Sequence, residues 1–90
     1  MANTKSAMKR QRQSEQRRLR NRTVRSAART TVAKARAAID HSDPESAEQV
    51  RIAQRTLDVG VRKGIVHPNN AARRKSRLMK RLNAATAGRS

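Results

Sequence analysis

Residues 5–29 are the segment that most limits what this chain can fold into. They include ten Lys and Arg residues, one acidic residue and no Gly, Pro or aromatic residue. Their types favour helix, so nothing opposes one continuous helix. Up to Arg22 the only apolar side chains are Ala7, Met8 and Leu19, which cannot form a stripe facing a protein core. This helix therefore needs a dense negative charge to offset the repulsion between its cations, and nucleic acid phosphate is the candidate.

The charge is distributed as two basic ends around a nearly neutral middle. The formal net charge is +17 over 90 residues. Residues 1–39 hold twelve Lys and Arg against one acid, residues 40–70 hold four against five, and residues 71–90 hold seven against none. Solubility does not require such an excess, so both ends are predicted to bind a polyanion.

The composition predicts one small domain with a thin core. Apolar residues make up 34% of the chain, and Phe, Tyr, Trp and Cys are absent. The chain therefore lacks large side chains to bury, disulfides and thiolate metal sites. No apolar run approaches the roughly 18 residues of a membrane span, and residues 1–10 do not resemble a signal peptide. We expect an intracellular, soluble protein with no membrane association.

Helical periodicity predicts three helices, over residues 6–39, 44–63 and 68–85. Residues 1–4 are expected to be an unstructured tip, with Asn3, Thr4 or Ser6 as N-caps. Asp43 before Pro44, and His67 before Pro68, are expected to cap the second and third helices. The predicted buried stripes are Val24, Ala28, Val32, Ala35 and Ile39 on the first helix, Ala47, Val50, Ala53 (or Gln54 beside it), Leu57 and Val61 on the second, and Ala71, Ala72, Leu78, Met79, Leu82 and Ala85 on the third.

Two glycines lie near the end of the second predicted helix. Gly60 lies inside it, where Gly costs about 1 kcal/mol relative to Ala, and is expected to mark close approach to a neighbouring helix. Gly64 is expected to end the helix as a Gly C-cap. Ile65 and Val66 then follow and are expected to plug one end of the bundle.

Short breaks between helices and the lack of any alternating strand pattern predict an all-α fold, an antiparallel three-helix bundle. The first helix would be on the order of 50 Å long, against about 27 Å for eighteen residues of either partner, so it should overhang the others. The single domain, residues 1–90, then divides into a basic arm over residues 1–23, a bundle over residues 24–86 and a frayed tail over residues 87–90.

The sequence contains few residues arranged for catalysis. His41 lies between Asp40 and Asp43, but such a cluster at a helix break is typical of a turn rich in capping residues. His67 is interpreted as a cap or an RNA contact, and the three Gly residues are isolated, so no phosphate-binding loop is formed. We predict no enzyme activity, no metal site, no cofactor and no small-molecule substrate.

The missing residue types narrow the mode of nucleic-acid binding. Without aromatic side chains there is no platform for stacking bases, which argues against the common single-strand modules. No leucine heptad follows the basic segment, so a zipper that reads DNA is excluded. Cations on all faces of one helix indicate contact on several sides, as in a cleft between folded RNA helices. The seventeen Arg against six Lys suit close, bidentate phosphate contact.

Motifs at both ends of the chain occur in the order of a known family. They are Met1-Ala2-Asn3 with Lys5-Ser6-Ala7 and Lys9-Arg10, Ser14-Glu15 followed by Arg17, Arg18 and Asn21, Arg25-Ser26, Arg29-Thr30, Ala38-Ile39, Lys63-Gly64-Ile65, His67, Asn69, Ala71-Ala72-Arg73, Lys75-Ser76-Arg77-Leu78 and Leu82-Asn83. On these residues the chain resembles the bacterial small-subunit ribosomal protein twenty (S-twenty) family. Residues 43–61 agree with the family only in helical pattern.

The resemblance implies a three-helix bundle whose long first helix is embedded in the RNA of the small (30S) ribosomal subunit. It implies direct binding to 16S ribosomal RNA, in the 5′ domain and near the foot of the long decoding-site helix, and an early role in assembly. We expect a cytoplasmic protein, within the ribosome, that is not a homo-oligomer. The alternative is a free nucleoid-like or regulatory nucleic-acid-binding protein.

Residues that match the family's motif are expected to contact RNA. Carried over by position, they are Asn3, Lys5, Ser6, Lys9, Arg10, Ser14, Arg17, Arg18, Asn21, Arg22, Arg25, Arg29, His67, Asn69, Arg73, Lys75, Ser76 and Arg77. Two positions depart from the pattern, because Pro68 and Met8 stand where Lys is common. A phosphate contact at each of these two positions is therefore in doubt.

Overall fold

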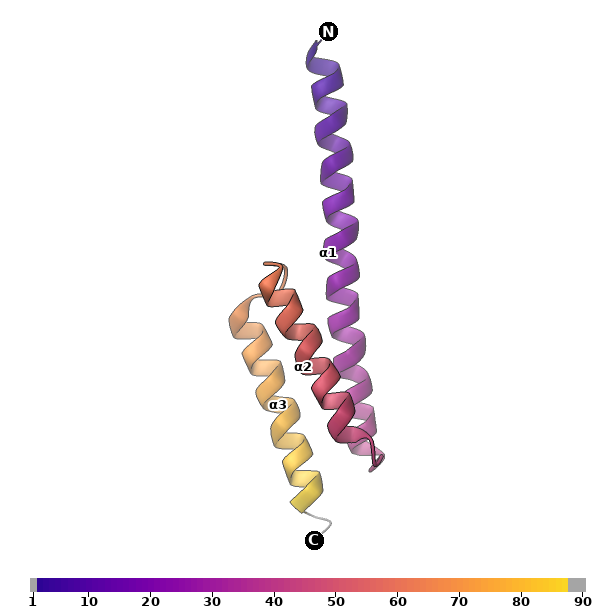
Figure 1. Ribbon diagram of the computed structural model, residues 1–90, viewed down its shortest axis with the longest axis vertical. Helices are drawn as coiled ribbons and strands as arrows, with labels where there is room; N and C mark the ends of the chain where they lie inside the picture. Colours follow the sequence, from indigo (N-terminus) through magenta and orange to yellow (C-terminus); the bar gives the residue numbers. More distant parts are fainter. Residues whose placement is uncertain (1, 88–90) are drawn as a thin grey trace.

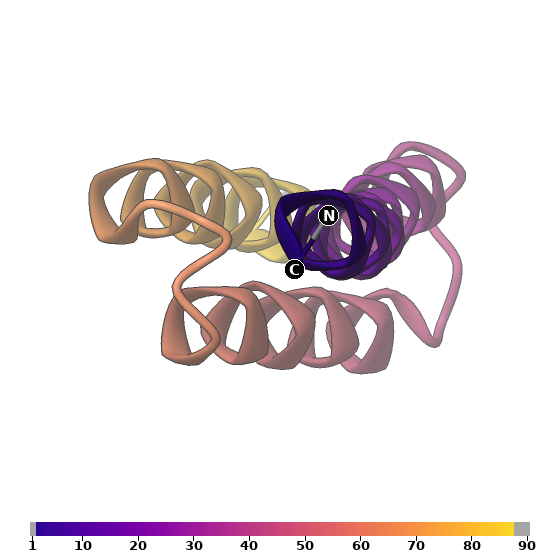
Figure 2. The same cartoon turned by 90° about the horizontal axis from the view of Figure 1, so that it is seen from above.

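Three α-helices make up the chain in the computed structural model, which describes residues 2–87 and, for side chains, residues 4–87. They are α1 (Ala2–Asp40), α2 (Ser46–Arg62) and α3 (Pro68–Ala87). The helices alternate in direction, and α2 and α3 pack beside the C-terminal half of α1 (Figure 1). Seen along the long axis, α1 and α3 lie next to each other over α2 (Figure 2). The predicted all-α, antiparallel three-helix bundle is confirmed.

The first helix overhangs the bundle, as predicted, and makes the molecule 72 Å long but only 21 by 13 Å across. It begins at Ala2, so the expected unstructured tip is wrong over residues 2–4, while Met1 is outside the described residues, and the N-caps at Thr4 and Ser6 are also wrong. The reason is that residues 2–6 include no helix breaker, so the helix continues past the capping-type residues. Asn3 also lies within α1, although its side chain is outside the described part. Of the expected frayed tail, Ala87 is helical and residues 88–90 are outside the described residues.

The core consists of small aliphatic side chains, and the largest fully buried ones are Leu57 and Val50. All the predicted α1 stripe is buried except Val24, which is half-buried. The buried residues of the described chain are Ala28, Val32, Ala35, Ala38 and Ile39 on α1, Ser46, Val50, Ala53, Leu57 and Gly60 on α2, and Ala71 and Leu78 on α3. The thin core that the composition predicts is therefore what holds the bundle together.

Three predicted core positions are wrong. Ala47 is exposed because the buried face of α2 is centred one residue earlier, on Ser46. Ala72 is exposed and Met79 is 39% exposed on α3. Each follows a buried residue directly, and one step along a helix turns the side chain by about 100°, away from the core. Leu82, Ala85 and Val61 do pack against the core as partly buried side chains.

Both connections begin with the same hydrogen-bond pattern at a helix C-terminus. At the end of α2, Gly64 has φ 74°, its N–H donates to the Val61 carbonyl at 2.9 Å, and the Ile65 N–H donates to the Gly60 carbonyl at 2.9 Å. These two bonds define a Schellman motif, which confirms the predicted Gly stop. At the end of α1 the left-handed position is taken by Ser42, with φ 55°.

The bonds after α1 repeat those after α2. The Ser42 N–H donates to the Ile39 carbonyl at 3.1 Å and the Asp43 N–H donates to the Ala38 carbonyl at 2.9 Å. A residue with a Cβ is disfavoured in this conformation, since left-handed backbone costs about 1–2 kcal/mol for most L-residues. The first connection is therefore built less favourably than the second.

The helix starts were predicted with mixed success. Pro68 begins α3, and the ring of His67 caps it by accepting a hydrogen bond from the Asn69 N–H at Nδ1, 3.1 Å away. The expected start of α2 at Pro44 is wrong, because Pro44 lies in a turn and the helix begins at Ser46. Asp43 still accepts a hydrogen bond at Oδ1, from the Glu45 N–H at 2.8 Å, but this bond closes the turn and does not cap the helix.

Gly60 marks a close approach, but mainly to the connection after α2 and not to a neighbouring helix. A Cβ at Gly60 would lie 2.6 Å from Cγ2 and 3.2 Å from Cβ of Val66, and 3.7 Å from Cγ1 of Val24 on α1. The Gly60 carbonyl also accepts the N–H groups of Ile65 and Val66, at 2.9 and 3.1 Å. Of the two residues predicted to plug this end of the bundle, Val66 packs against the core, whereas Ile65 is half-buried.

Candidate nucleic-acid interface

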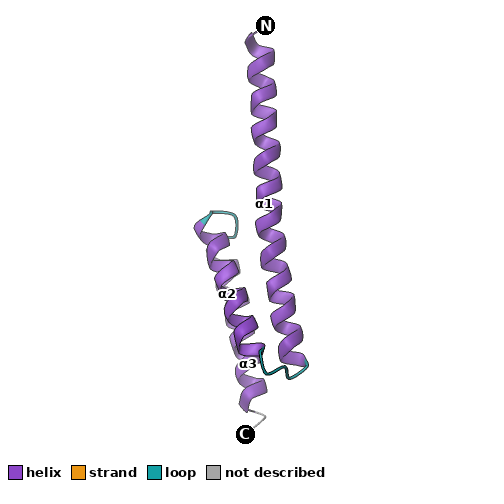
Figure 3. Cartoon of the chain, turned by 45° about the vertical axis from the view of Figure 1, so that its right-hand side comes forward, coloured by secondary structure: helices purple, strands orange, loops and turns teal. Residues whose placement is uncertain are grey.

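The arm is the part of α1 that extends beyond the other two helices (Figure 3). Every side chain from residue 4 to residue 20 is exposed. Within the described part of α1, the first half-buried side chains are Asn21 and Val24, where the helix reaches the bundle. At about 100° per residue, Lys5 and Lys9 lie on the opposite side of the helix from Arg18. The arm thus presents cations on more than one side and no face to the protein core.

Seven of the predicted RNA contacts lie together in a shallow groove along one side of α1. Its lining residues are Ser14, Arg17, Arg18, Asn21, Arg22, Arg25, Ser26 and Arg29. Ser26 is the one member that the sequence did not predict. The other predicted residues of the first helix with described side chains, Lys5, Ser6, Lys9 and Arg10, are exposed nearer the N-terminal tip and outside this groove.

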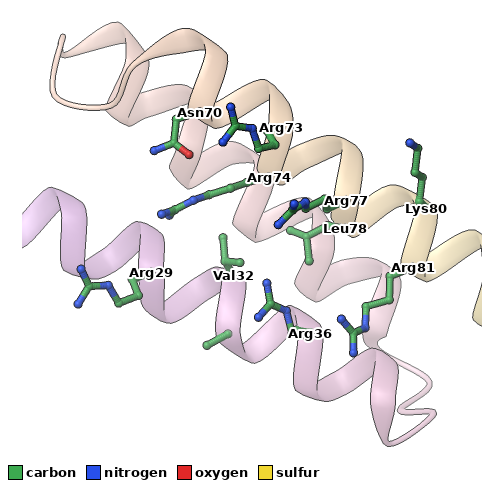
Figure 4. A pocket seen from close by; sticks show the side chains of 11 residues that line it. Arg29, Val32, Arg36, Asn70, Arg73, Arg74, Arg77, Leu78, Lys80 and Arg81 are labelled. Carbon is green, nitrogen blue, oxygen red and sulfur yellow. The ribbon is translucent and has the colours of Figure 1, made fainter.

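A second, larger groove of about 820 Å³ runs between α1 and α3 (Figure 4). It is lined by Arg29, Val32, Ala33, Arg36, Asn70, Arg73, Arg74, Arg77, Leu78, Lys80 and Arg81. Arg74 reaches from α3 towards α1 near Val32, Arg77 lies beside Leu78, and Lys80 points away from α1 (Figure 4). The groove thus combines an apolar surface with guanidinium groups supplied by two helices.

Arg29 lines both grooves, so they form one basic track from Ser14 on the arm to Arg81 on α3. Of the residues in the larger groove, only Arg29, Arg73 and Arg77 were predicted as RNA contacts. Arg36, Asn70, Arg74, Lys80 and Arg81 also line this groove, although the sequence did not single them out. Four-residue steps from Arg73 through Arg77 to Arg81 mark one face of a helix, but that spacing could not reveal that this face lies against α1.

The remaining predicted residues on α3 are not brought into either groove. Lys75 forms an ion pair with Asp58 of α2, at 2.9 Å, and so lies on the α2 side. Asn69 and Ser76 are exposed elsewhere on the helix. His67 caps α3, which satisfies one of the two roles predicted for it. Met8, which departs from the family pattern, is 57% exposed on the arm.

The track is positively charged with little compensation. Within residues 4–87, one ion pair touches it, where Arg81 Nε and Nη2 donate to the two carboxylate oxygens of Asp40 at 3.0 and 3.2 Å. The other ion pairs of the described chain involve Glu48 and Asp58 on α2. The acidic partners of the three ion pairs thus lie at the end of α1 and on α2. The Arg side chains that line the two grooves face solvent, with little negative charge beside them.

Neither a metal centre nor a membrane span is visible in the described part of the chain. No group of three or more His, Cys, Asp or Glu side chains there could hold a metal ion. Among the helices of residues 2–87, none has the length and apolar character needed to cross a bilayer. The chemistry that these surfaces can perform is the binding of anions by Arg, Lys and amide groups.

Comparison with known proteins gives one consistent family. The family model described as "Ribosomal protein S20" matches residues 2–83. A protein of Thermomicrobium roseum is 56% identical over 90 residues, covering 99% of this chain and 91% of its own. Relatives from Corynebacterium efficiens (51% over 84 residues; 92% and 97% covered) and a Roseiflexus species (54% over 87 residues; 97% and 96%) are also similar. All three are named "Small ribosomal subunit protein bS20". The family predicted from motifs at the two ends is thereby confirmed: this chain belongs to the ribosomal protein S20 family.

Proposed function

We propose that this chain is a structural protein of the small (30S) ribosomal subunit that binds 16S ribosomal RNA directly and stabilises the RNA fold during assembly. The observation that supports this most is the arm, an exposed helix with cations on more than one side and no protein to pack against. Relatives about half identical to this chain carry the name of a small-subunit protein. The proposed place of action is the cytoplasm, within the ribosome.

In this proposal RNA takes the place of a protein core around the arm. Phosphates on several sides neutralise the repulsion between neighbouring cations and release condensed counterions, which favours binding. The planar Arg fork can contact two phosphate oxygens at once and can stack on a base. The proposed RNA regions are the 5′ domain and the foot of the long decoding-site helix, with the arm lying between folded RNA helices.

The protein's role is positioning and not catalysis. A helix embedded in RNA can hold two RNA segments at a fixed separation, because both segments contact one rigid element. The nearly neutral α2 completes the core through Val50, Ala53 and Leu57, and leaves the basic track of α1 and α3 open. The bundle thus anchors one end of the arm at a defined place on the RNA.

The test is the affinity for the 5′ domain of 16S RNA as a function of salt. Arg18→Ala and Arg25→Ala each remove a groove cation, and each should weaken binding and reduce the salt slope by about one unit per lost phosphate contact. Arg51→Ala and Arg55→Ala remove the same charge from exposed positions on α2 and serve as matched controls. Equal losses in both pairs would refute a specific interface and leave diffuse attraction.

A second measurement distinguishes the alternative of a free nucleoid-like or regulatory nucleic-acid binder. A ribosomal protein should remain bound to sedimenting 30S subunits at a salt concentration at which a general DNA-binding protein dissociates from DNA. The reason is that the affinity of the general binder depends almost entirely on counterion release. Loss from the subunits at the same salt as from duplex DNA would favour the alternative.

A further inference from the structure

The core holds α3 less firmly than it holds the other two helices. Among the described residues, α3 fully buries only Ala71 and Leu78, while α1 and α2 each bury a row of at least four side chains. Lys75 and Arg81 also tie α3 to its neighbours, through ion pairs of 2.9 and 3.0 Å. Both pairs are substantially exposed, and exposed pairs contribute little to stability. The docking of α3 is therefore sensitive to any other force between α1 and α3.

Such a force exists in the groove between these two helices. Arg29 and Arg36 line one wall of it from α1, and Arg73, Arg74 and Arg77 line the other wall from α3. Like charges on facing walls repel each other, and apolar surface between them strengthens the field in the groove. Within residues 4–87 the ion pair of Arg81 is the only one that reaches this groove. In the free protein the charges of the groove thus oppose the packing of α3.

We infer that this groove is a phosphate clamp, in which a single RNA backbone strand neutralises both walls and so holds α3 against α1. The inference rests on the proposed function and adds that the ligand completes the bundle. A strand fits better than a lone anion for two reasons. Arg73 and Arg77 repeat along the wall at about 6 Å, one helical turn. The groove also continues through Arg29 into the groove on the arm, which gives a linear polyanion an unbroken path.

Binding in the clamp must stabilise α3 by linkage. A ligand that binds only the closed groove reduces the population with α3 undocked by the factor 1 + [L]/Kd, which is about 100-fold at a ligand concentration 100 times Kd. Amide hydrogen exchange reports this directly, since the amides of α3 exchange through its local opening. RNA should therefore slow the exchange of the α3 amides, although α3 is not part of the arm.

The experiment measures amide exchange of the full chain by mass spectrometry, with and without a short single-stranded oligouridylate. The groove variant is Arg36→Gln with Arg77→Gln, two exposed side chains on facing walls. The matched control is Arg12→Gln with Arg20→Gln, which removes the same charge from exposed arm positions outside both grooves. Inorganic phosphate at the same phosphate concentration tests whether a linked strand is required.

In the native chain and in the control, the oligonucleotide should slow exchange in α3 by about 10- to 100-fold, while inorganic phosphate should not. In the groove variant the slowing of α3 should be lost, and protection of the arm should remain. Arm protection without α3 protection in the native chain would overturn the clamp and leave the proposed function intact. Equal loss in both variants, or equal protection by inorganic phosphate, would also overturn it. If neither the oligonucleotide nor 16S RNA slowed amide exchange anywhere in the chain, the proposed function itself would be refuted.

Discussion

Replacing Gly60 by Ala tests whether the approach of Val66 limits the bundle. In an unconstrained helix interior this change stabilises by about 1 kcal/mol, since Ala is the better helix former. Here the new Cβ would lie 2.6 Å from Val66 Cγ2 and 3.2 Å from its Cβ. A rotation of the Val66 side chain cannot relieve the second distance, because Cβ is fixed to the backbone. The backbone is in turn held by two hydrogen bonds to the Gly60 carbonyl.

The expected balance is unfavourable. Overpacking costs typically about 1–3 kcal/mol, so after the gain in helix propensity Gly60→Ala should destabilise the bundle by up to about 2 kcal/mol. For a domain of this size that lowers Tm by roughly 4–8 °C per kcal/mol. The assay is thermal unfolding followed by far-ultraviolet circular dichroism, because the chain has no aromatic residue to report on tertiary structure.

A double-mutant cycle with Val66→Ala provides the control. Val66→Ala removes Cγ2 and should by itself cost about 1 kcal/mol of burial. With Cγ2 absent the 2.6 Å clash disappears, while the 3.2 Å approach to the Cβ of residue 66 remains. Gly60→Ala should therefore cost less in this background than in the native one, so the two changes together should cost less than the sum of the two alone. A rise in Tm for Gly60→Ala in the native background would refute the reasoning, since it would mean that the connection moves aside freely.

Three further outcomes can be checked on the free protein. Leu57→Ala should destabilise the bundle by about 2–4 kcal/mol, because Leu57 is fully buried, and unchanged urea unfolding would contradict its place in the core. Ser42→Gly should stabilise by up to about 1 kcal/mol, because φ is 55° there, and a lower Tm would show that the Ser42 side chain contributes more than its strain costs. Residues 5–22 should exchange their amides rapidly without RNA, because like charges and the lack of a core leave the arm unsupported; strong protection in low salt would count against this.

The sequence predicted the architecture well where the pattern was strongest. The α1 stripe was placed correctly from Ala28 to Ile39 because it repeats over more than three turns. Gly64 and Pro68 marked a helix end and a helix start, since each is suited to its position by backbone conformation alone. The start of α2 was harder, because Pro44 and Ser46 are both acceptable there and only tertiary packing selects Ser46.

The candidate interface was predicted less completely than the fold. Residues on the arm could be proposed from the sequence because a basic helix without an apolar face has no protein core to pack against. The groove between α1 and α3 depends on which face of α3 meets α1. The neighbouring apolar pairs of α3, Ala71-Ala72 and Leu78-Met79, allow more than one choice of face. The sequence therefore did not single out Arg36 on α1 or Arg74 on α3 as lining residues of this groove. Lys75 on α3 was predicted to contact RNA, but it forms an ion pair with Asp58 of α2.

The continuity of α1 has a geometric consequence. From Ala2 to Asp40 one helix joins the tip of the arm to the centre of the core without a break (Figure 3). Inserting a single residue at the junction would turn every arm cation by about 100° relative to α3 and lift it by about 1.5 Å. Seven extra residues would nearly restore the direction but shift the arm by about 10.5 Å. The number of residues in this one helix thus sets both the direction and the distance of the arm cations relative to α3. A change in the length of the helix would misalign these cations even though none of them is replaced.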